Sequence, residues 1–211
     1  TTSVERLTGA AERVTTTTVQ TATSIFQSFA PTVTVANVAD TIPARLSPTE
    51  AASVVDGRAM EVLITEVEKQ QVLATFGESS MKLASIGESG AMEPLLANGS
   101  VAFTRGSTIR VDGSGMLAGS QVAVWMYSTP MQLGTVDVKA DGSFAEVLSI
   151  PSNVELGGHK IQFVGSKADG KEFHFAVGVT VVDETALIMN RAGAMTVAQA
   201  SSLADANVVT V

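Results

Sequence analysis

Apolar and polar residues alternate along much of the chain, and the stretch Gln121–Ser128 shows the pattern most clearly. It predicts one strand that begins after a glycine and ends before Pro130. Alternate residues of a strand point to opposite sides of its sheet. One side of this strand carries Val122, Val124 and Met126. The other side carries Trp125 and Tyr127, which are the only Trp and Tyr of the chain. We therefore expect the core to cover one side and a second partner to cover the other.

Seven such stretches lie between residues 98 and 183, at intervals of about ten residues. The predicted strands are Ser100–Thr104, Thr108–Asp112, Gln121–Ser128, Gly134–Lys139, Phe144–Ile150, Lys160–Gly165 and Glu172–Val182. Turn-forming dipeptides separate several of them: Asp112-Gly113, Asp141-Gly142, Gly157-Gly158 and Asp169-Gly170. Because no strand–helix–strand alternation is present, we expect a mainly β fold, an antiparallel sandwich.

Two of these strands show their core side by alternation. In the last strand the residues predicted to face one way are Phe173, Phe175, Val177, Val179 and Val181. In the fifth strand they are Phe144, Val147 and Ile150, with a slip of one residue. The alternation therefore predicts which side chains of each strand enter the core.

A smaller β segment precedes the sandwich. Ser47-Pro48-Thr49-Glu50 resembles a helix start with Ser47 as the cap, followed by a short turn up to Ser53. Asp56-Gly57 then predicts a hairpin turn. The strands expected after it are Ala59–Thr65, Gln71–Phe76 and Met81–Ile86. A meander of this size is not stable alone, so we expect it to pack on a neighbour.

The two ends differ from the β blocks. Apolar residues in 1–30 recur at three- and four-residue steps, which favours an amphipathic helix over an extended arm, although a run of threonines weakens the helical pattern. Residues 32–35 alternate like a strand. Residues 184–206 are rich in alanine and predict a helix, which an apolar tail at 207–211 follows.

The chain thus divides into four predicted parts. An N-terminal helix or arm with its connector occupies 1–45, and the meander occupies 46–97. The sandwich follows at 98–183. The Ala-rich helical segment and its tail complete the chain at 184–211.

The sandwich resembles a known group of modules. The residues that carry the resemblance are Gly113-Ser114-Gly115, Gly119-Ser120-Gln121-Val122, Trp125-Met126-Tyr127-Ser128-Thr129-Pro130, Leu133-Gly134-Thr135-Val136, Asp141-Gly142-Ser143-Phe144, Gly158-His159 and Val164-Gly165. They are similar to immunoglobulin-like modules of large secreted and cell-surface proteins of actinobacteria. The preceding meander resembles the small β segment that often leads such modules, so the likeness extends over about residues 46–182. It implies export to the cell surface and a role as spacer, adhesive unit or wall-associated scaffold.

Composition excludes several classes of function. The net charge of −8, without a local basic cluster, argues against nucleic acid and anionic membrane surfaces as partners. The chain has no Cys, which excludes disulfides and thiolate metal sites. No apolar run is long enough to span a bilayer. The chain begins at Thr1 without a Met, which fits removal of a signal peptide and equally a trimmed chain.

We searched the sequence for catalytic and metal sites and predict neither, and no cofactor. His159 and His174 are expected to face opposite ways, with no carboxylate at ligand spacing beside them. Residues 113–118 fit a relaxed dinucleotide-binding pattern, but a strand follows where that motif requires a helix. We therefore expect a protein that is not an enzyme.

Two functions remain open. The first is an extracellular structural protein, such as a self-assembling subunit of a surface layer or filament, which contacts other copies or cell-surface proteins. Its candidate contact residues lie in the apolar ends: Ile25, Phe26, Phe29, Val208, Val209 and Val211. An extended arm of this kind can add a strand to the sheet edge of a neighbour.

The alternative is an adhesin or carbohydrate-binding module. Trp125 and Tyr127 lie two residues apart on one strand, which places their rings side by side, about 7 Å apart. A sugar-stacking platform requires these rings to be exposed and surrounded by polar donors. The other interpretation of the pair is a contact with the meander or with another copy.

Overall fold

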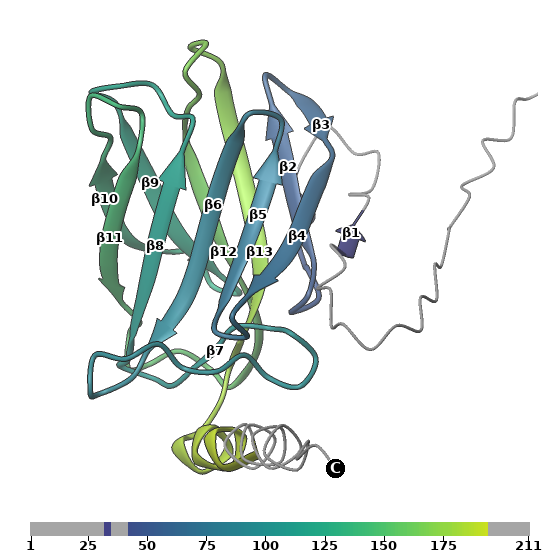
Figure 1. Cartoon of the computed structure of the whole chain (residues 1–211), viewed down its shortest axis with the longest axis vertical. Coiled ribbons are helices and arrows are strands. Elements are labelled where there is room, and N and C mark those ends of the chain that lie inside the picture. Colours follow the sequence, from purple (N-terminus) through teal and green to yellow (C-terminus); the bar gives the residue numbers. More distant parts are fainter. Residues whose placement is uncertain (1–31, 35–41, 194–211) are drawn as a thin grey trace, which may run out of the picture.

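The computed structural model of the protein describes residues 32–34 and 42–193, which form two β-sheets packed face to face (Figure 1). Sheet A has the strand order β1 (Thr32–Thr34), β4 (Val62–Val67), β5 (Gln71–Phe76), β6 (Ser79–Ile86), β8 (Thr108–Ser114) and β11 (Phe144–Ser149). Sheet B has the order β10 (Met131–Asp137), β9 (Gln121–Tyr127), β12 (Gly157–Ser166), β13 (Glu172–Val181), β2 (Ala51–Val55) and β3 (Arg58–Met60). The short β7 (Ala102–Phe103) pairs in parallel with β13, and the other pairs are antiparallel. The predicted antiparallel β-sandwich is confirmed.

Strands from both predicted β blocks occur in both sheets. β6 of the first block pairs with β8 of the second from Ser80–Ser114 to Ile86–Thr108, and β2 pairs with β13. The meander therefore packs on its neighbour by extending the two sheets, and it does not lie on the outside of one. Residue 97, the expected boundary, separates strands that share hydrogen bonds.

Aromatic rings from both sheets meet in the core. The ring of Phe76 in β5 stacks on that of Phe175 in β13 at a centroid distance of 5.1 Å, and lies 5.8 Å from that of Phe173. The ring of Phe163 in β12 also packs on that of Phe175, at a centroid distance of 5.8 Å. All four side chains are buried. The predicted inward set of the last strand, which includes Phe173 and Phe175, is confirmed.

The Asp-Gly dipeptides do not all behave alike. At the predicted hairpin between β2 and β3, Asp56 and Gly57 both have positive φ angles, of 50° and 70°, as a tight two-residue turn requires. The turn predicted at Asp112-Gly113 is wrong, because β8 continues through both residues. A Cβ at Gly113 would collide with the ring of Phe144 on the neighbouring β11. The glycine therefore makes room for a core ring and does not reverse the chain.

Two further predictions need correction. The Ser47 amide donates to the Glu50 carboxylate at 2.9 Å, which is one of the two contacts of a capping box, but the Glu50 amide donates to the Ser47 carbonyl oxygen. β2 begins at once, and no helix forms. Of the set predicted for the fifth strand, Phe144 and Ile150 are buried, but the core residue between them is Leu148, whereas Val147 is 52% exposed. Leu148 lies opposite Ile109, whose side chain is fully buried, and opposite residues of an antiparallel pair point to the same side.

The predicted strand Ala59–Thr65 is divided between the sheets. β3 ends at Met60 in sheet B, and β4 starts at Val62 in sheet A. Glu61 lies at the crossing point and is exposed. One predicted strand therefore serves two sheets, which the sequence pattern does not reveal.

The start of the C-terminal helix is confirmed over residues 184–193. Asp183 caps it, because its carboxylate accepts a hydrogen bond from the Ala186 amide at 2.7 Å. Leu187 is buried against the end of the sandwich. The remainder of the predicted helix and the expected N-terminal helix or arm at 1–30 lie outside the described residues.

We predict that Phe76→Ala lowers the free energy of unfolding by about 3–5 kcal/mol, because it removes the ring that joins the two sheets. Denaturant unfolding followed by circular dichroism measures the change. Leu117→Ala, at a side chain that is 39% exposed, serves as the control and is expected to change the stability by less than about 1 kcal/mol. A loss below about 1 kcal/mol for Phe76→Ala would contradict the role given to this ring.

Candidate interaction surfaces

The two aromatic side chains singled out in the sequence lie on the outer face of sheet B. Val122, Val124 and Met126 point into the core, as predicted, and Trp125 and Tyr127 are half-buried on the other side. The meander strands do not cover this face, because they are members of the two sheets. The interpretation of the pair as a seam under the meander is therefore wrong.

The chain segment 42–50 crosses this face near the ends of β12 and β13. The Gly178 amide donates to the Glu50 carbonyl oxygen at 2.8 Å. A Cβ at Gly178 would collide with the Ser47 carbonyl oxygen, so the segment lies directly on β13. We call residues 42–50 the strap.

A lysine connects the strap to Tyr127. Lys160 lies opposite Tyr127 across β9 and β12, and its Nζ is 4.9 Å from the centroid of the tyrosine ring. The same Nζ donates to the Pro43 carbonyl oxygen at 2.5 Å. Lys160 is only 6% exposed, and burial lowers the pKa of its ammonium group. One side of the tyrosine ring is thus occupied by a desolvated cation, so Tyr127 is not a free stacking platform on that side.

Trp125 is flanked by two amides. Gln132 of β10 and Gln162 of β12 are its partners across the two neighbouring strands. Cross-strand partners have their Cβ atoms about 5 Å apart. The indole therefore lies between two hydrogen-bonding side chains on the outer face.

Gln162 belongs to a short chain of polar contacts. Its Nε2 lies 3.3 Å from His174 Nδ1, and His174 Nε2 lies 2.7 Å from the Glu172 carboxylate. We assign the proton of the neutral ring to Nε2, because a carboxylate accepts and the Gln162 amide nitrogen donates. These contacts fix the orientation of the imidazole.

A cleft of about 540 Å³ opens between these side chains. Its lining residues come from β9, β12, β13, the β2–β3 hairpin and the strap: Ile42, Val54, Asp56, Gly57, Tyr127, Lys160, Gln162, Glu172 and His174. Trp125 is not among them. The sequence indicated Tyr127, but it did not indicate Lys160, Gln162 or the partners of His174.

The two histidines face opposite ways, as predicted. His159 is buried, with Nδ1 3.0 Å from Ser128 Oγ and Nε2 2.8 Å from the Glu155 carbonyl oxygen. His174 lies on the outer face. Across residues 32–34 and 42–193, no group of three or more His, Asp or Glu side chains is arranged to hold a metal ion.

The four sheet edges differ in how they are protected. β10 has a bulge between Gln132 and Gly134, and β3 has only three residues and carries Arg58. In β11, Glu146 lies opposite the core residue Val111, so an exposed charge occupies an inward position of that edge strand. Bulges, short strands and inward charges all hinder pairing with another chain.

The fourth edge strand is β1, and the strand that it covers, β4, differs from the other three edges. Val62, Leu63 and Ile64 are apolar, and its one charged residue, Glu66, lies beyond them. This apolar part is covered by β1, which pairs with it in the register Thr32–Ile64, Val33–Leu63 and Thr34–Val62. Residues 62–64 of β4 thus lack the features that hinder pairing with another strand, and they are the residues on which β1 pairs.

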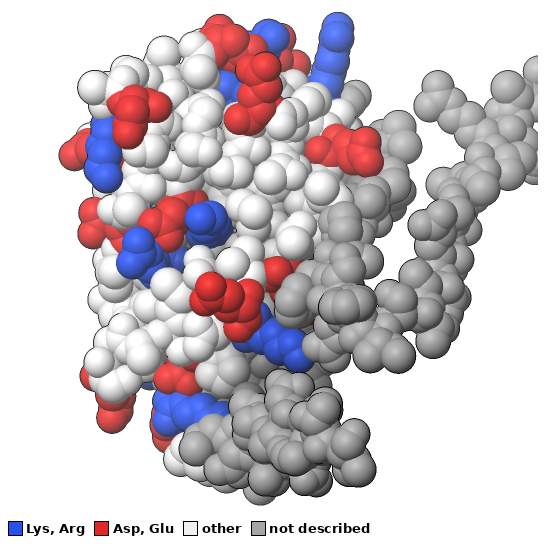
Figure 2. Space-filling model, viewed as in Figure 1, with Lys and Arg blue, Asp and Glu red and all other residues white. Residues whose placement is uncertain are grey.

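Charge is mixed on the surface of the described residues. In the view of Figure 2, acidic and basic side chains lie close together, and wide areas carry neither. Arg110 and Asp112, for example, form an ion pair at 2.9 Å between neighbouring positions of β8, and this contact raises the pKa of Arg110. The face in view thus has no basic stripe of the kind that nucleic-acid binding requires.

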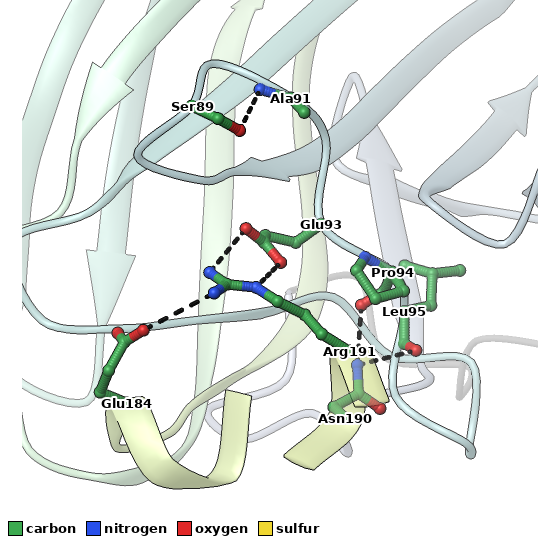
Figure 3. A network of polar contacts seen from close by, with 8 residues as sticks. All are labelled: Ser89, Ala91, Glu93, Pro94, Leu95, Glu184, Asn190 and Arg191. Carbon is green, nitrogen blue, oxygen red and sulfur yellow. Dashed lines mark hydrogen bonds and ion pairs between the residues drawn. The ribbon is translucent and has the colours of Figure 1, made fainter. Parts of the chain in front are cut away.

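Polar contacts hold the C-terminal helix to the end of the sandwich (Figure 3). The Arg191 guanidinium donates two hydrogen bonds, at 2.6 and 2.8 Å, to the carboxylate of the buried Glu93, which raise the pKa of Arg191. The Asn190 amide donates to the carbonyl oxygens of Pro94 and Leu95 at 3.1 and 3.3 Å. A second cleft, of about 630 Å³, lies beside this helix and is lined in part by Arg105, Leu187 and Arg191.

The other candidate residues of the sequence are not placed. Ile25, Phe26, Phe29, Val208, Val209 and Val211 lie outside the described residues. No helix within the described part of the chain is long and apolar enough to cross a membrane.

Comparisons with known proteins assign the chain to no family. No family model matches the chain, and no curated protein matches it. Among solved structures, the chain is similar to a lytic polysaccharide monooxygenase of Jonesia denitrificans, with 15% identity and a TM-score of 0.29. The match covers 46% of this chain and 63% of that protein.

We predict that Arg191→Met loosens the helix from the sandwich, because it leaves the buried Glu93 carboxylate without its partner, at a cost of about 1–3 kcal/mol. Amide hydrogen exchange at residues 184–193 is expected to accelerate.

The double variant Glu93→Leu/Arg191→Met removes both charges and is expected to recover part of the protection. Lys171→Met, which removes an exposed ion pair with Asp169, is the matched control and is expected to have little effect. Unchanged exchange at 184–193 in Arg191→Met would rule out this contact as the helix anchor.

Proposed function

We propose that this chain is a non-enzymatic structural protein of the cell surface whose copies associate by strand addition at the β4 edge. The observation that supports it most is the pairing of β1 with β4. Strand addition gives affinity through backbone hydrogen bonds, which any chain in an extended conformation can supply.

The contrast between the edges supports this function. β10, β11 and β3 carry a bulge, an inward charge and a short charged strand. The apolar residues Val62, Leu63 and Ile64 of β4 carry no such device. An unprotected edge of this kind can pair with a strand of another chain unless a strand already covers it. The protein supplies a covering strand, β1, from its own N-terminal region.

β1 can pair with β4 in the same register whether the two strands belong to one chain or to two copies. Residues 35–41 separate β1 from the rest of the sandwich, and seven residues span at most about 25 Å. Since two copies present identical edges and identical strands, β1 of one copy can take the place of β1 in the next. Repetition of this exchange builds an open chain of copies, as a filament or layer requires.

The surface location follows from the resemblance to immunoglobulin-like modules of secreted actinobacterial proteins. The low charged content of 16% agrees with a Thr/Gly-rich β protein of this kind, whereas the absence of Cys leaves the compartment open. Other copies or neighbouring surface proteins are the partners that this function implies.

Cross-linking between two single-cysteine variants tests the exchange, and the Cys-free chain makes the test clean. Val33 and Leu63 are opposite partners, so Val33→Cys and Leu63→Cys place two thiols within disulfide reach when β1 is on β4. We expect an equimolar mixture of the two variants to form a disulfide-linked dimer on oxidation. Each variant alone is expected to form much less.

The double variant Val33→Cys/Leu63→Cys reports the alternative, because a bond within one chain leaves the protein monomeric. Val33→Cys mixed with Thr108→Cys, which lies on β8 and not on the β4 edge, controls for random collisions. If the mixture stays monomeric at high concentration while the double variant closes its bond within one chain, copies do not exchange β1.

A further inference from the structure

The cleft on the outer face of sheet B has the features of a built ligand site. Two of its polar residues, Lys160 and Gln162, are 6% and 8% exposed. Lys160 contacts the Pro43 carbonyl oxygen and the Tyr127 ring, and Gln162 contacts His174. A polar side chain that is desolvated at the base of a cleft gains free energy when a ligand completes its hydrogen bonds.

Lys160 has donors that no acceptor among the described residues uses. An ammonium group carries three hydrogens, and among the described residues the Pro43 carbonyl oxygen is the hydrogen-bond acceptor of Nζ. The Glu172 carboxylate and the Asp56 carboxylate supply acceptors at the rim. Val54, Ile42 and the Tyr127 ring form the apolar wall. Donors, acceptors and an apolar wall thus line a single space.

The combination of donors, acceptors and apolar side chains in the cleft limits the class of ligand that can bind. A polyanion is disfavoured, because Glu172 and Asp56 line the cleft and the chain has a net charge of −8. A purely apolar ligand would cover Lys160 and Gln162 without completing their hydrogen bonds. A cation would approach the Lys160 ammonium group.

A neutral polyhydroxylated molecule avoids both the charge repulsion and the loss of hydrogen bonds that disfavour these other ligands. Its hydroxyl groups both donate and accept, and its C–H face can pack on the apolar wall. We infer that this cleft binds a neutral saccharide chain, with Lys160 and Gln162 as donors and Glu172 as an acceptor. The cleft volume of about 540 Å³ lies within the usual range of ligand pockets. This site is independent of the proposed exchange of β1.

The position of the site differs from a platform made of the two rings. Trp125 does not line the cleft, and one side of the Tyr127 ring is covered by Lys160. Trp125 lies next to Gln162, so its fluorescence reports events in the cleft. The chain thus carries its own single probe beside the site.

Titration with neutral hexasaccharides of glucose, mannose and N-acetylglucosamine tests the inference, followed by Trp125 fluorescence and by the NMR signals of the His174 ring. We expect at least one of them to bind saturably and to shift both signals. Dextran sulfate of similar length serves as the polyanion and is expected not to bind.

Substitutions at the two glutamines opposite Trp125 on its neighbouring strands provide a matched pair of variants. Gln162→Leu removes a donor of the cleft, whereas Gln132→Leu removes the amide on the other side of Trp125, outside the cleft. We expect Gln162→Leu to weaken binding about tenfold or more and Gln132→Leu to leave it unchanged. Glu172→Gln, at an exposed side chain, weakens it several-fold without a risk to folding.

Three results would overturn the inference. The first is that none of the three hexasaccharides binds at 10 mM, a concentration about tenfold above a Kd of 1 mM. The second is equal weakening by Gln162→Leu and Gln132→Leu, which would move the site to Trp125 itself. The third is saturable binding of dextran sulfate at the His174 signals.

Discussion

The packing of Phe76 on Phe173 and Phe175 is the contact on which the rest of the structure depends. Phe76 comes from the first β block and the other two from the last strand, so these rings join parts of the chain that are about one hundred residues apart. Once they are packed, β4–β6 must continue sheet A and β2–β3 must continue sheet B. The strands of the meander then leave the outer face of sheet B uncovered, and the strap, the cleft and both aromatic side chains share this face.

Patterns of period two predicted the strands well where one side of the strand is buried. β5 occurs as predicted from Gln71 to Phe76, and the inward residues of β9 and β13 are confirmed. The predictions failed where a neighbour decides the outcome. Gly113 forms no turn because the Phe144 ring needs its space, and Ser47–Glu50 makes no helix because β2 begins at Ala51.

The candidate site was only partly visible in the sequence for the same reason. Trp125 and Tyr127 stand out as single residues of their type, whereas Lys160 and Gln162 look like ordinary outward polar positions of a strand. Lys160 is buried where it contacts the strap, which is more than one hundred residues away in sequence and passes over β12 and β13. The Glu172–His174–Gln162 contacts likewise depend on the register between β12 and β13.

The proposed function depends on the asymmetry of the edges, since only the β4 edge combines an apolar run with an added strand among the edges described. Its most direct test is an isotope-filtered NMR measurement on an equimolar mixture of ¹³C-labelled and unlabelled protein at high concentration. Our account predicts contacts between Val33 of one copy and Leu63 of another. Filtered spectra without such contacts, together with Val33–Leu63 contacts within the labelled chain alone, would contradict it.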